Sequence, residues 1–377
     1  MKSIDEINKK IKENKALILT ASQAKEMAEE EGTRSLAEKC DVVTTATYSP
    51  MCSSGVFINT GHTNPQMKMQ QVFLDDVQAY GGIACADFYL GATQESGNDK
   101  SYGGAHVIQK LVKGEKISFK AYGTSTDCYP KNHFTKEITI DDLNQVYFFN
   151  PRNCYQNYNA ACNSSEKELK TYMGSLLPNL GSINYAGAGE ISPLMNDPYL
   201  QTIGIGTRIF FCGGEGFISW EGTQYNAFAK RDEKTRLPIA PSATLAITAD
   251  LRQVKPEFIT PLYIKGYGVS LYISIGIPIP VLNSDIAHAL SVRNKDIKTQ
   301  VYDFATGKTV GTVTYDQLHK NNIHLSDKKP VSRTMSKIRD AYKITEILKK
   351  QIESGTFELT QPVKPLPIYG KCTPIEK

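Results

Sequence analysis

Apolar residues recur at helical spacing mainly near the two ends of the chain. Residues 4–14 and 22–39 are predicted to be helices, because both segments are rich in helix formers and Ser22 is a candidate N-cap for the second. Near the other end, "SRTMSKIRDAYKITEILKKQIESG" predicts a helix that ends at Gly355. The following "TFELTQPVKPLP" is expected to form an extended arm on the body. The apolar positions of the C-terminal helix are Met335, Ile338, Ala341, Ile344 and Leu348.

Between these ends, the pattern changes to short β-rich runs separated by glycine-rich loops. The runs include "DVVTTATY", "QVYFFNPRN", "TLAITADL" and "KGYGVSLYISIGIPIPVL". A short helix is expected to begin near Ser164, in "SSEKELKTYMGSL". We therefore predict an α+β fold with N-terminal helices and one large mixed domain, residues 1–330, rich in short strands. A C-terminal helix and arm, residues 331–377, should pack on the same domain.

The composition is that of a globular protein with little charge bias. The 377 residues are 40% hydrophobic and 22% charged, and the net charge is +4. No dense basic stripe with interleaved aromatic residues is present, so we expect no nucleic-acid partner. The N-terminus has no apolar signal core, and Gly276 and prolines interrupt the longest apolar stretch, so we expect a cytoplasmic protein without a membrane partner. A homo-oligomer and a monomer are equally compatible with these features.

Glycine-rich and cysteine-containing segments suggest cofactor sites that their spacing does not support. "GIGTRIFFCGGEG" has Ile209 where a dinucleotide fingerprint needs glycine, so a tight turn or an amide nest for a carboxylate is favoured instead. No C-x-x-C pair and no histidine pair at i, i+4 is present, so no metal site is predicted. Four cysteines in loop-like contexts leave an iron–sulfur cluster open. They are Cys52, Cys128, Cys154 and Cys162.

Two of the eight cysteines stand in a context that favours a reactive thiol. Cys52 in "SPMCSSG" and Cys128 in "GTSTDCYP" each follow a β-rich run and lie among small, turn-forming residues. Cys85 and Cys212 have apolar neighbours and are expected to be buried, while Cys40 and Cys372 are expected to be incidental. A reactive thiolate also needs a nearby cation or histidine. Candidates are Lys131, His133, His62 and His106.

Several segments together resemble the homocysteine biosynthesis protein family, whose characterised activity is L-aspartate semialdehyde sulfurtransferase. They include "CDVVTTATYSPMCSSGVFINTGH", "GTSTDCYP", "GSLLPNLGSINYAGAGEISPLMNDP" and "IGIGTRIFFCGGEGFISWEGTQ", and the resemblance runs from about residue 15 to residue 365. It implies that L-aspartate 4-semialdehyde, sulfide and two electrons give L-homocysteine. It also implies a persulfide on Cys128, a second functional thiol at Cys52, and a small ferredoxin-like electron-donor protein. The C-terminal CBS modules of many members are expected to be absent here.

The electron count agrees with a second thiol and an external donor. Addition of sulfide to an aldehyde and loss of water gives a thioaldehyde, and two more electrons give the thiol. No flavin or nicotinamide fingerprint is present, but two thiols that close to a disulfide release two electrons and then need re-reduction. We therefore expect Cys128 to carry sulfur and Cys52 to resolve it, with no resident cofactor predicted.

Substrate contacts can be assigned as hypotheses from residue type. The general-acid candidates are His106, His62 and Tyr129. Arg152 and Arg208 are the loop-placed candidates for the substrate carboxylate. Candidates for the substrate ammonium are Glu190, Asp197 and Glu215. An iron–sulfur desulfidase or sulfur transferase on another substrate, and a non-catalytic persulfide carrier, are the alternative functions.

Overall fold

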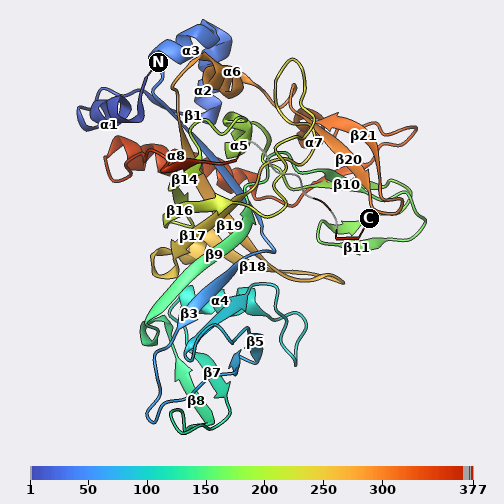
Figure 1. Cartoon of the computed structure of the whole chain (residues 1–377). Coiled ribbons are helices and arrows are strands. Elements are labelled where there is room, and N and C mark those ends of the chain that lie inside the picture. Colours follow the sequence, from blue (N-terminus) through green and yellow to red (C-terminus); the bar gives the residue numbers. More distant parts are fainter. Residues whose placement is uncertain (1, 368–372, 374, 377) are drawn as a thin grey trace.

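A long sheet forms the centre of the protein. The computed structural model describes residues 2–367, 373, 375 and 376. In this part of the chain, the long sheet has the order β1-β2-β19-β15-β16-β17-β9-β3-β6, and β18 pairs with β19 (Figure 1). Its strands are β1 (Ile18–Thr20), β2 (Val42–Pro50), β3 (Gly55–Asn59), β6 (Asp87–Gly91), β9 (Gln145–Asn153), β15 (Arg208–Phe211), β16 (Gly214–Glu221), β17 (Leu245–Asp250), β18 (Ile259–Ile264) and β19 (Gly268–Pro280).

Smaller sheets lie beside the long sheet and beyond its β3–β6 end (Figure 1). One has the order β21-β20-β10-β13-β22 and the other β5-β4-β7-β8, while β11 pairs with β12 and β14 with β23. Their strands are β4 (Gln71–Leu74), β5 (Val77–Ala79), β7 (Ile117–Tyr122), β8 (His133–Ile138), β10 (Ala160–Cys162), β11 (Leu169–Thr171), β12 (Gly174–Leu176), β13 (Ser182–Tyr185), β14 (Gly204–Ile205), β20 (Lys298–Asp303), β21 (Lys308–Thr314), β22 (Val331–Thr334) and β23 (Lys364–Pro365).

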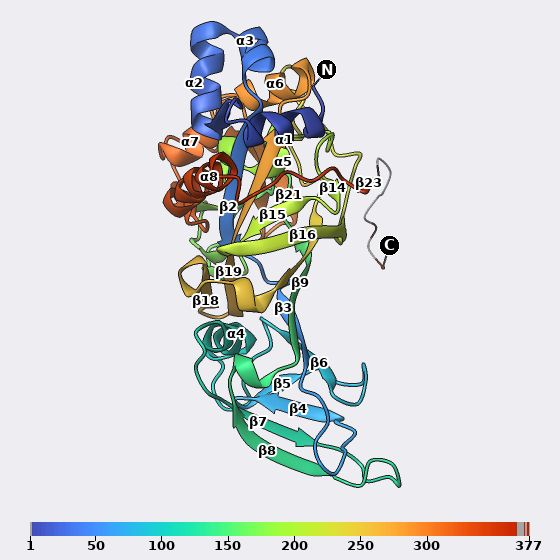
Figure 2. The same cartoon turned by 90° about the vertical axis from the view of Figure 1, so that its left-hand side faces the viewer.

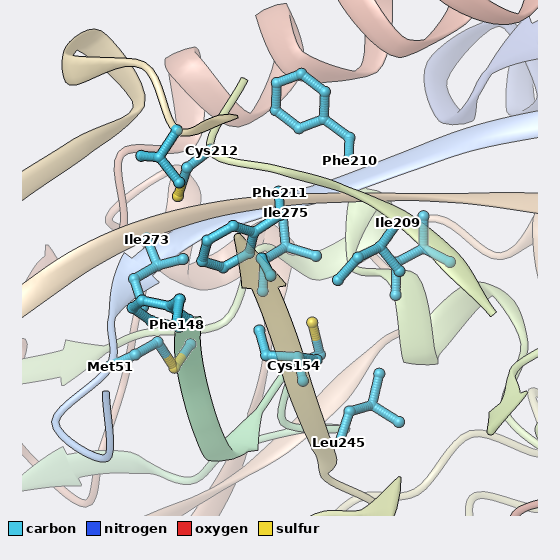
Figure 3. Packing of buried hydrophobic residues seen from close by; sticks show 14 of the residues in the cluster. Met51, Phe148, Cys154, Ile209, Phe210, Phe211, Cys212, Leu245, Ile273 and Ile275 are labelled. Atoms are coloured by element: carbon cyan, nitrogen blue, oxygen red, sulfur yellow. The ribbon is translucent and has the colours of Figure 1, made fainter. Parts of the chain in front are cut away.

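Strand β19 is covered on both faces. Nearly all of its thirteen residues are buried, and its sequence is a continuous run of apolar and small residues rather than an alternating one. Pro278 and Pro280 lie where β19 pairs with β2 but not with β15, so neither proline interrupts the pairing with β15. Figure 3 shows the core beside this strand, where Cys154 and Cys212 pack among aromatic and branched side chains. The predicted burial of Cys212 is confirmed.

Helices from both ends of the chain cover the β1–β2 end of the long sheet (Figure 2). The predicted helix over 22–39 is two helices, because Gly32 between them adopts a φ of +89°. The N-cap is Thr20 rather than Ser22, and Gln23 completes a capping box with it. The helices are α1 (Ile4–Lys12), α2 (Ala21–Glu31), α3 (Thr33–Lys39), α4 (Gly104–Val112), α5 (Pro193–Asn196), α6 (Ser284–Ser291), α7 (Tyr315–His319) and α8 (Ile338–Glu353).

Helix α8 packs across β2 and β19, where a glycine allows a close approach. A Cβ on Gly276 would lie 3.1 Å from Leu348 and 3.2 Å from Ile344. The predicted C-terminal helix is confirmed, and Gly355 follows its last turn with a φ of +72°. It begins at Ile338, later than the helical pattern suggests, because the preceding residues extend as β22 along β13.

The prediction of a short helix near Ser164 is wrong. The segment forms the β11–β12 hairpin, whose turn includes Gly174 at a φ of +82°. The Ser164 hydroxyl donates a hydrogen bond to the carboxylate of Asp303 (2.5 Å), so it holds a loop against β20 rather than capping a helix. Local helix propensity in this segment therefore yields to the pairing with neighbouring strands.

The β4, β5, β7 and β8 strands with their loops form a lobe at one end of the molecule (Figure 2). Helix α4 contacts both β7 of the lobe and β18 and β19 of the body. Val72 and Phe119 of the lobe belong to the same buried cluster as Val56 and Ile273 of the body. The lobe and the body thus share one core, and the chain is a single α+β domain, as the sequence predicts.

The arm after α8 lies extended along the body as far as it is described. Its β23 pairs with β14, and the Thr360 hydroxyl accepts a hydrogen bond from the backbone N–H of Arg208 (2.8 Å). The extended arm is confirmed up to residue 367, whereas Cys372 lies outside the described residues. Within those residues, no helix is long and apolar enough to cross a membrane.

Candidate active site

A cavity of about 280 Å³ lies beside the long sheet, where several separate segments meet. The end of β2 and the turn after it form one wall, and the chain after β9 forms another. The tip of the β18–β19 hairpin and the turn of the β11–β12 hairpin contribute one tyrosine each. This volume suits a substrate of amino-acid size. The residues that carry its chemistry are Ser49, Cys52, Arg152, Tyr155, Tyr158, Tyr172, Ser192, Gln224 and Tyr267.

Cys52 projects into this cavity from the turn that ends β2. Its sulfur lies 3.3 Å from the hydroxyl of Ser270 on β19, and its side chain is half-buried. The turn is held by Ser54, whose hydroxyl donates to the carbonyl of Met51 (2.6 Å) and accepts from the amide of Asn150 (3.0 Å). The prediction that this thiol is presented at a strand end is confirmed.

Arg152 is the cationic residue of the cavity. It lies next to the last residue of β9, where its backbone N–H donates a hydrogen bond to the Asn150 side chain (2.7 Å). Its buried Nε has no hydrogen-bond partner, and it forms no ion pair with any described residue. No aspartate or glutamate is among the described residues that line the cavity. A positive charge without a counter-charge, in a cavity of this size, is suited to a carboxylate ligand.

Four tyrosines form another part of the cavity lining. The rings of Tyr155 and Tyr158 lie 4.6 Å apart, and the Tyr158 hydroxyl donates to that of Tyr172 (3.0 Å). The ring of Tyr267 meets Tyr172 edge-on at 6.1 Å. Burial raises the pKa of Tyr155 and of Tyr267 to about 12, so their hydroxyls remain protonated donors at neutral pH.

The loop between β7 and β8 belongs to the lobe (Figure 1). Cys128 lies exposed in this loop and does not line the cavity. The Thr126 hydroxyl is 3.6 Å from its sulfur. Tyr129 packs near His62 at 6.2 Å, and a hydrogen bond with the Cys85 thiol raises the pKa of Tyr129. The predicted burial of Cys85 is wrong, because it is half-exposed in a loop beside the β7–β8 loop. The lobe thus gathers two thiols, a phenol and an imidazole.

Other predicted site residues lie outside the cavity and have local partners. His106 accepts the backbone N–H of Gly103 at the start of α4 (3.2 Å), and burial lowers its pKa. Arg208 forms an ion pair with Glu215 across β15 and β16, and its guanidinium lies 4.7 Å from the Phe357 ring. These contacts give His106 a structural role at the start of a helix, and they give Arg208 and Glu215 a structural role between two paired strands.

The two remaining acidic candidates also serve the fold. Asp197 is fully buried and accepts hydrogen bonds from the backbone of Gln201 (2.9 Å) and from both the amide and the hydroxyl of Thr202 (2.7 and 2.8 Å). Glu190 accepts the backbone N–H of Asn294 (2.9 Å). Neither residue lines the cavity, so of all the sequence candidates the structure brings together Cys52 and Arg152.

The tyrosine wall was not among the sequence candidates. Tyr155 and Tyr158 stand in "NCYQNYNA", directly after Arg152, and Tyr267 stands between two glycines in "KGYG". The glycine flanks of Tyr267 are the one local signal that could have drawn attention to it. The assembly of the whole tyrosine wall depends on segments up to more than a hundred residues apart in the sequence that meet at one cavity.

The cysteines do not form a metal-binding set in the described part of the chain. No group of three or more His, Cys, Asp or Glu side chains converges there. Cys162 and Cys154 are buried in different clusters, and burial raises the pKa of each thiol to about 12. The residues present therefore do not fit an iron–sulfur cluster, and no step below involves one.

A thiol, an unpaired guanidinium and tyrosine hydroxyls around one cavity are the groups expected of an enzyme that uses thiol chemistry on a small anionic substrate. The profile of the family described as "Homocysteine biosynthesis enzyme, sulfur-incorporation" matches residues 16–359. The chain belongs to this family.

Relatives named for an enzyme activity support this assignment over nearly the whole chain. The chain is 43% identical to the L-aspartate semialdehyde sulfurtransferase of Methanocaldococcus jannaschii, over 97% of its own length and 73% of the relative. It is 41% identical to the enzyme of the same name from Methanosarcina acetivorans, over 98% and 73%. An uncharacterized protein of Methanothermobacter thermautotrophicus is 28% identical over 85% of the chain and 72% of that protein. No solved structure matches the chain.

Proposed function

We propose that this protein is an L-aspartate semialdehyde sulfurtransferase, which converts L-aspartate 4-semialdehyde, sulfide and two electrons to L-homocysteine. The observation that carries the proposal is that Cys52 and Arg152 line one cavity of amino-acid size, with no aspartate or glutamate among the described residues that line it. The two relatives above 40% identity are named for this activity. A thiol near a carboxylate-binding guanidinium is what an amino-acid sulfur transfer requires.

The substrate orientation follows from the charges in the cavity. The carboxylate pairs with the guanidinium of Arg152 in a charge-assisted contact. The ammonium has no acidic partner among the described lining residues, so it lies against the faces of Tyr155 and Tyr158, whose quadrupoles attract cations. Glu190, Asp197 and Glu215 do not line the cavity and are not part of this proposal. The aldehyde then points toward Cys52.

The reaction needs an outside source of electrons. Sulfide adds to the aldehyde carbon and water leaves, which gives a thioaldehyde. Two electrons and two protons, taken from a dithiol that becomes a disulfide, then give the thiol of homocysteine. An external electron donor, which we take to be a small ferredoxin-like protein, restores the dithiol.

We further propose that Cys128 takes sulfane sulfur from a sulfane-sulfur donor as a persulfide and passes it to the Cys52 thiol in the cavity of a second copy of the chain, which leaves Cys128 as a thiol. Two further electrons and two protons, from the same external donor, then release that sulfur from Cys52 at the sulfide level. Cys128 is exposed on the lobe, whereas Cys52 lies in the cavity of the body. The shared core of lobe and body opposes a movement of the lobe toward its own cavity. A homo-oligomer, or a transient encounter of two copies, would bring the two thiols together.

The function is tested by incubating the anaerobically purified protein with L-aspartate 4-semialdehyde, sulfide and a strong reductant, and by measuring homocysteine by mass spectrometry. Homocysteine formation that is lost in Cys52→Ser supports the proposal. Absence of homocysteine there, together with a persulfide that forms on Cys128 from a sulfane-sulfur donor when the reductant is left out, would identify a sulfur carrier instead. Turnover of a different sulfur-accepting substrate by the same protein would identify another sulfur transferase.

The transfer between copies has its own test. Cys52→Ser and Cys128→Ser are prepared separately, and the Cys52→Ser protein is loaded with ³⁵S-persulfide on Cys128. We expect ³⁵S to reach Cys52 of the unlabelled Cys128→Ser protein after mixing, and we expect the mixture to regain activity that neither variant has alone. Label that stays on the loaded chain would contradict transfer between copies.

A further inference from the structure

The tip of the β18–β19 hairpin places one aromatic side chain at the mouth of the cavity. The tip is the segment "IKGYG", in which Gly266 has a φ of +79° and Gly268 a φ of +134°. These backbone conformations suit glycine and set the direction of Tyr267 between them. The Tyr267 side chain lines the cavity while its residue remains 43% exposed. It therefore lies at the boundary between the cavity and solvent.

Both hydroxyl side chains beside the Cys52 sulfur come from this hairpin. The Ser270 hydroxyl lies 3.3 Å from the sulfur. Tyr267 lines the same cavity as Cys52, close enough for the thiol to contribute to the raised pKa of the phenol. The ring of Tyr267 is held edge-on against Tyr172 at 6.1 Å. Burial, followed by the proximity of Cys52, raises the pKa of Tyr267 to about 12, so the phenol holds its proton at neutral pH. Its O–H can then donate either to the sulfur or to a substrate oxygen beside it.

We propose that Tyr267 is a catalytic residue of this site, which donates a hydrogen bond to the sulfur of Cys52 and a proton to the aldehyde oxygen of the substrate. This inference rests on the proposed function, because it assigns the general acid for that reaction. When a sulfur nucleophile adds to the aldehyde carbon, a C–S bond forms and the C=O π pair moves to oxygen. That oxygen takes the Tyr267 proton, and the tyrosinate recovers a proton from water. No electron changes hands in this step.

The geometry distinguishes Tyr267 from the general-acid candidates found in the sequence. His106 already uses Nδ1 to accept the N–H of Gly103, and it lies outside the cavity. Tyr129 and His62 lie next to each other but outside the cavity. Tyr267 lines the cavity together with Cys52, which places an acid near an aldehyde bound at Cys52.

The test uses Tyr267→Phe, which keeps the ring and its contact with Tyr172. Tyr263→Phe is the matched control, since Tyr263 lies on the same hairpin, is 42% exposed and does not line the cavity. The first readout is the pH dependence of iodoacetamide alkylation, followed on the tryptic peptide that contains Cys52, with the Cys128 peptide as an internal standard. Loss of a hydrogen bond to the thiolate should shift the midpoint for Cys52 to higher pH in Tyr267→Phe alone.

The second readout is homocysteine formation, which should fall about 10²–10⁴-fold in kcat with little change in KM for the aldehyde. An unchanged alkylation midpoint for Cys52 would overturn the contact with its sulfur. A changed midpoint with unchanged kcat would overturn the role as acid. If the unsubstituted protein forms no homocysteine, the proposed function fails, and the alkylation profile still decides whether Tyr267 serves Cys52.

Discussion

Removal of the Arg152 guanidinium should weaken substrate binding without weakening the fold. In the substrate-free protein Arg152 has no ion-pair partner among the described residues, and its buried Nε is unpartnered. Arg152→Met therefore breaks no salt bridge and removes a charge that nothing neutralises. Arg208→Met is the natural comparison, because it breaks the ion pair with Glu215 and the contact with Phe357.

The size of the effect follows from the desolvated carboxylate that Arg152→Met would leave in the cavity. Truncating one partner of a buried, hydrogen-bonded charge pair costs about 2–5 kcal/mol in binding. At about 1.4 kcal/mol per factor of ten, kcat/KM for L-aspartate 4-semialdehyde should fall roughly 30-fold to several thousand-fold. Arg208 is half-buried and paired at the surface of the sheet, so Arg208→Met should cost about 1 kcal/mol of stability and leave kcat/KM within about twofold.

The assay measures initial rates of homocysteine formation at several aldehyde concentrations, together with urea unfolding of both variants. Arg152→Lys adds a second comparison, because an ammonium keeps the charge but loses the bidentate geometry and should recover part of the binding. Unchanged kcat/KM in Arg152→Met, or a large loss in Arg208→Met with an intact fold, would refute the assignment of the carboxylate to Arg152.

The remaining predictions concern buried charges that the fold requires. Lys25 is fully buried between Asn196 and the carbonyl of Leu290, and burial lowers its pKa from 10.5 to about 7. Between about pH 7 and 10, the unfolded chain therefore binds a proton that the folded chain lacks, so the free energy of unfolding should rise with pH across that window. In Lys25→Met this pH dependence should disappear. A rise of the same size in Lys25→Met would contradict the assignment of the pH dependence to Lys25. Asp197→Ala should lower stability by about 2–4 kcal/mol in urea unfolding, because several buried donors lose their acceptor, whereas KM should stay unchanged if Asp197 has no role in binding the ammonium.

The sequence predicts the parts of this protein that depend on local patterns. The continuous apolar run of β19, the helix that ends at Gly355 and the turn that carries Cys52 each follow from neighbouring residues. The prediction of a helix near Ser164 is wrong, because the Ser164 hydroxyl donates a hydrogen bond to Asp303, which lies more than a hundred residues away in the sequence. Arg152 and Arg208 look equivalent in sequence. Arg208 forms an ion pair with Glu215 on the adjacent strand, whereas Arg152 has no such partner among the described residues, and only the folded structure reveals this difference. The tyrosine wall needs three segments to meet, which no local pattern encodes.

The shared core of lobe and body also has a kinetic consequence. A thiol on a hinged arm would visit its own cavity in a first-order process, independent of how much protein is present. Cys128 stands on a lobe whose buried residues continue into the body. In the transfer that we propose, its delivery of sulfur therefore depends on an encounter between molecules. Turnover per chain should then rise with protein concentration until the copies are fully associated, and dilution alone should slow the enzyme.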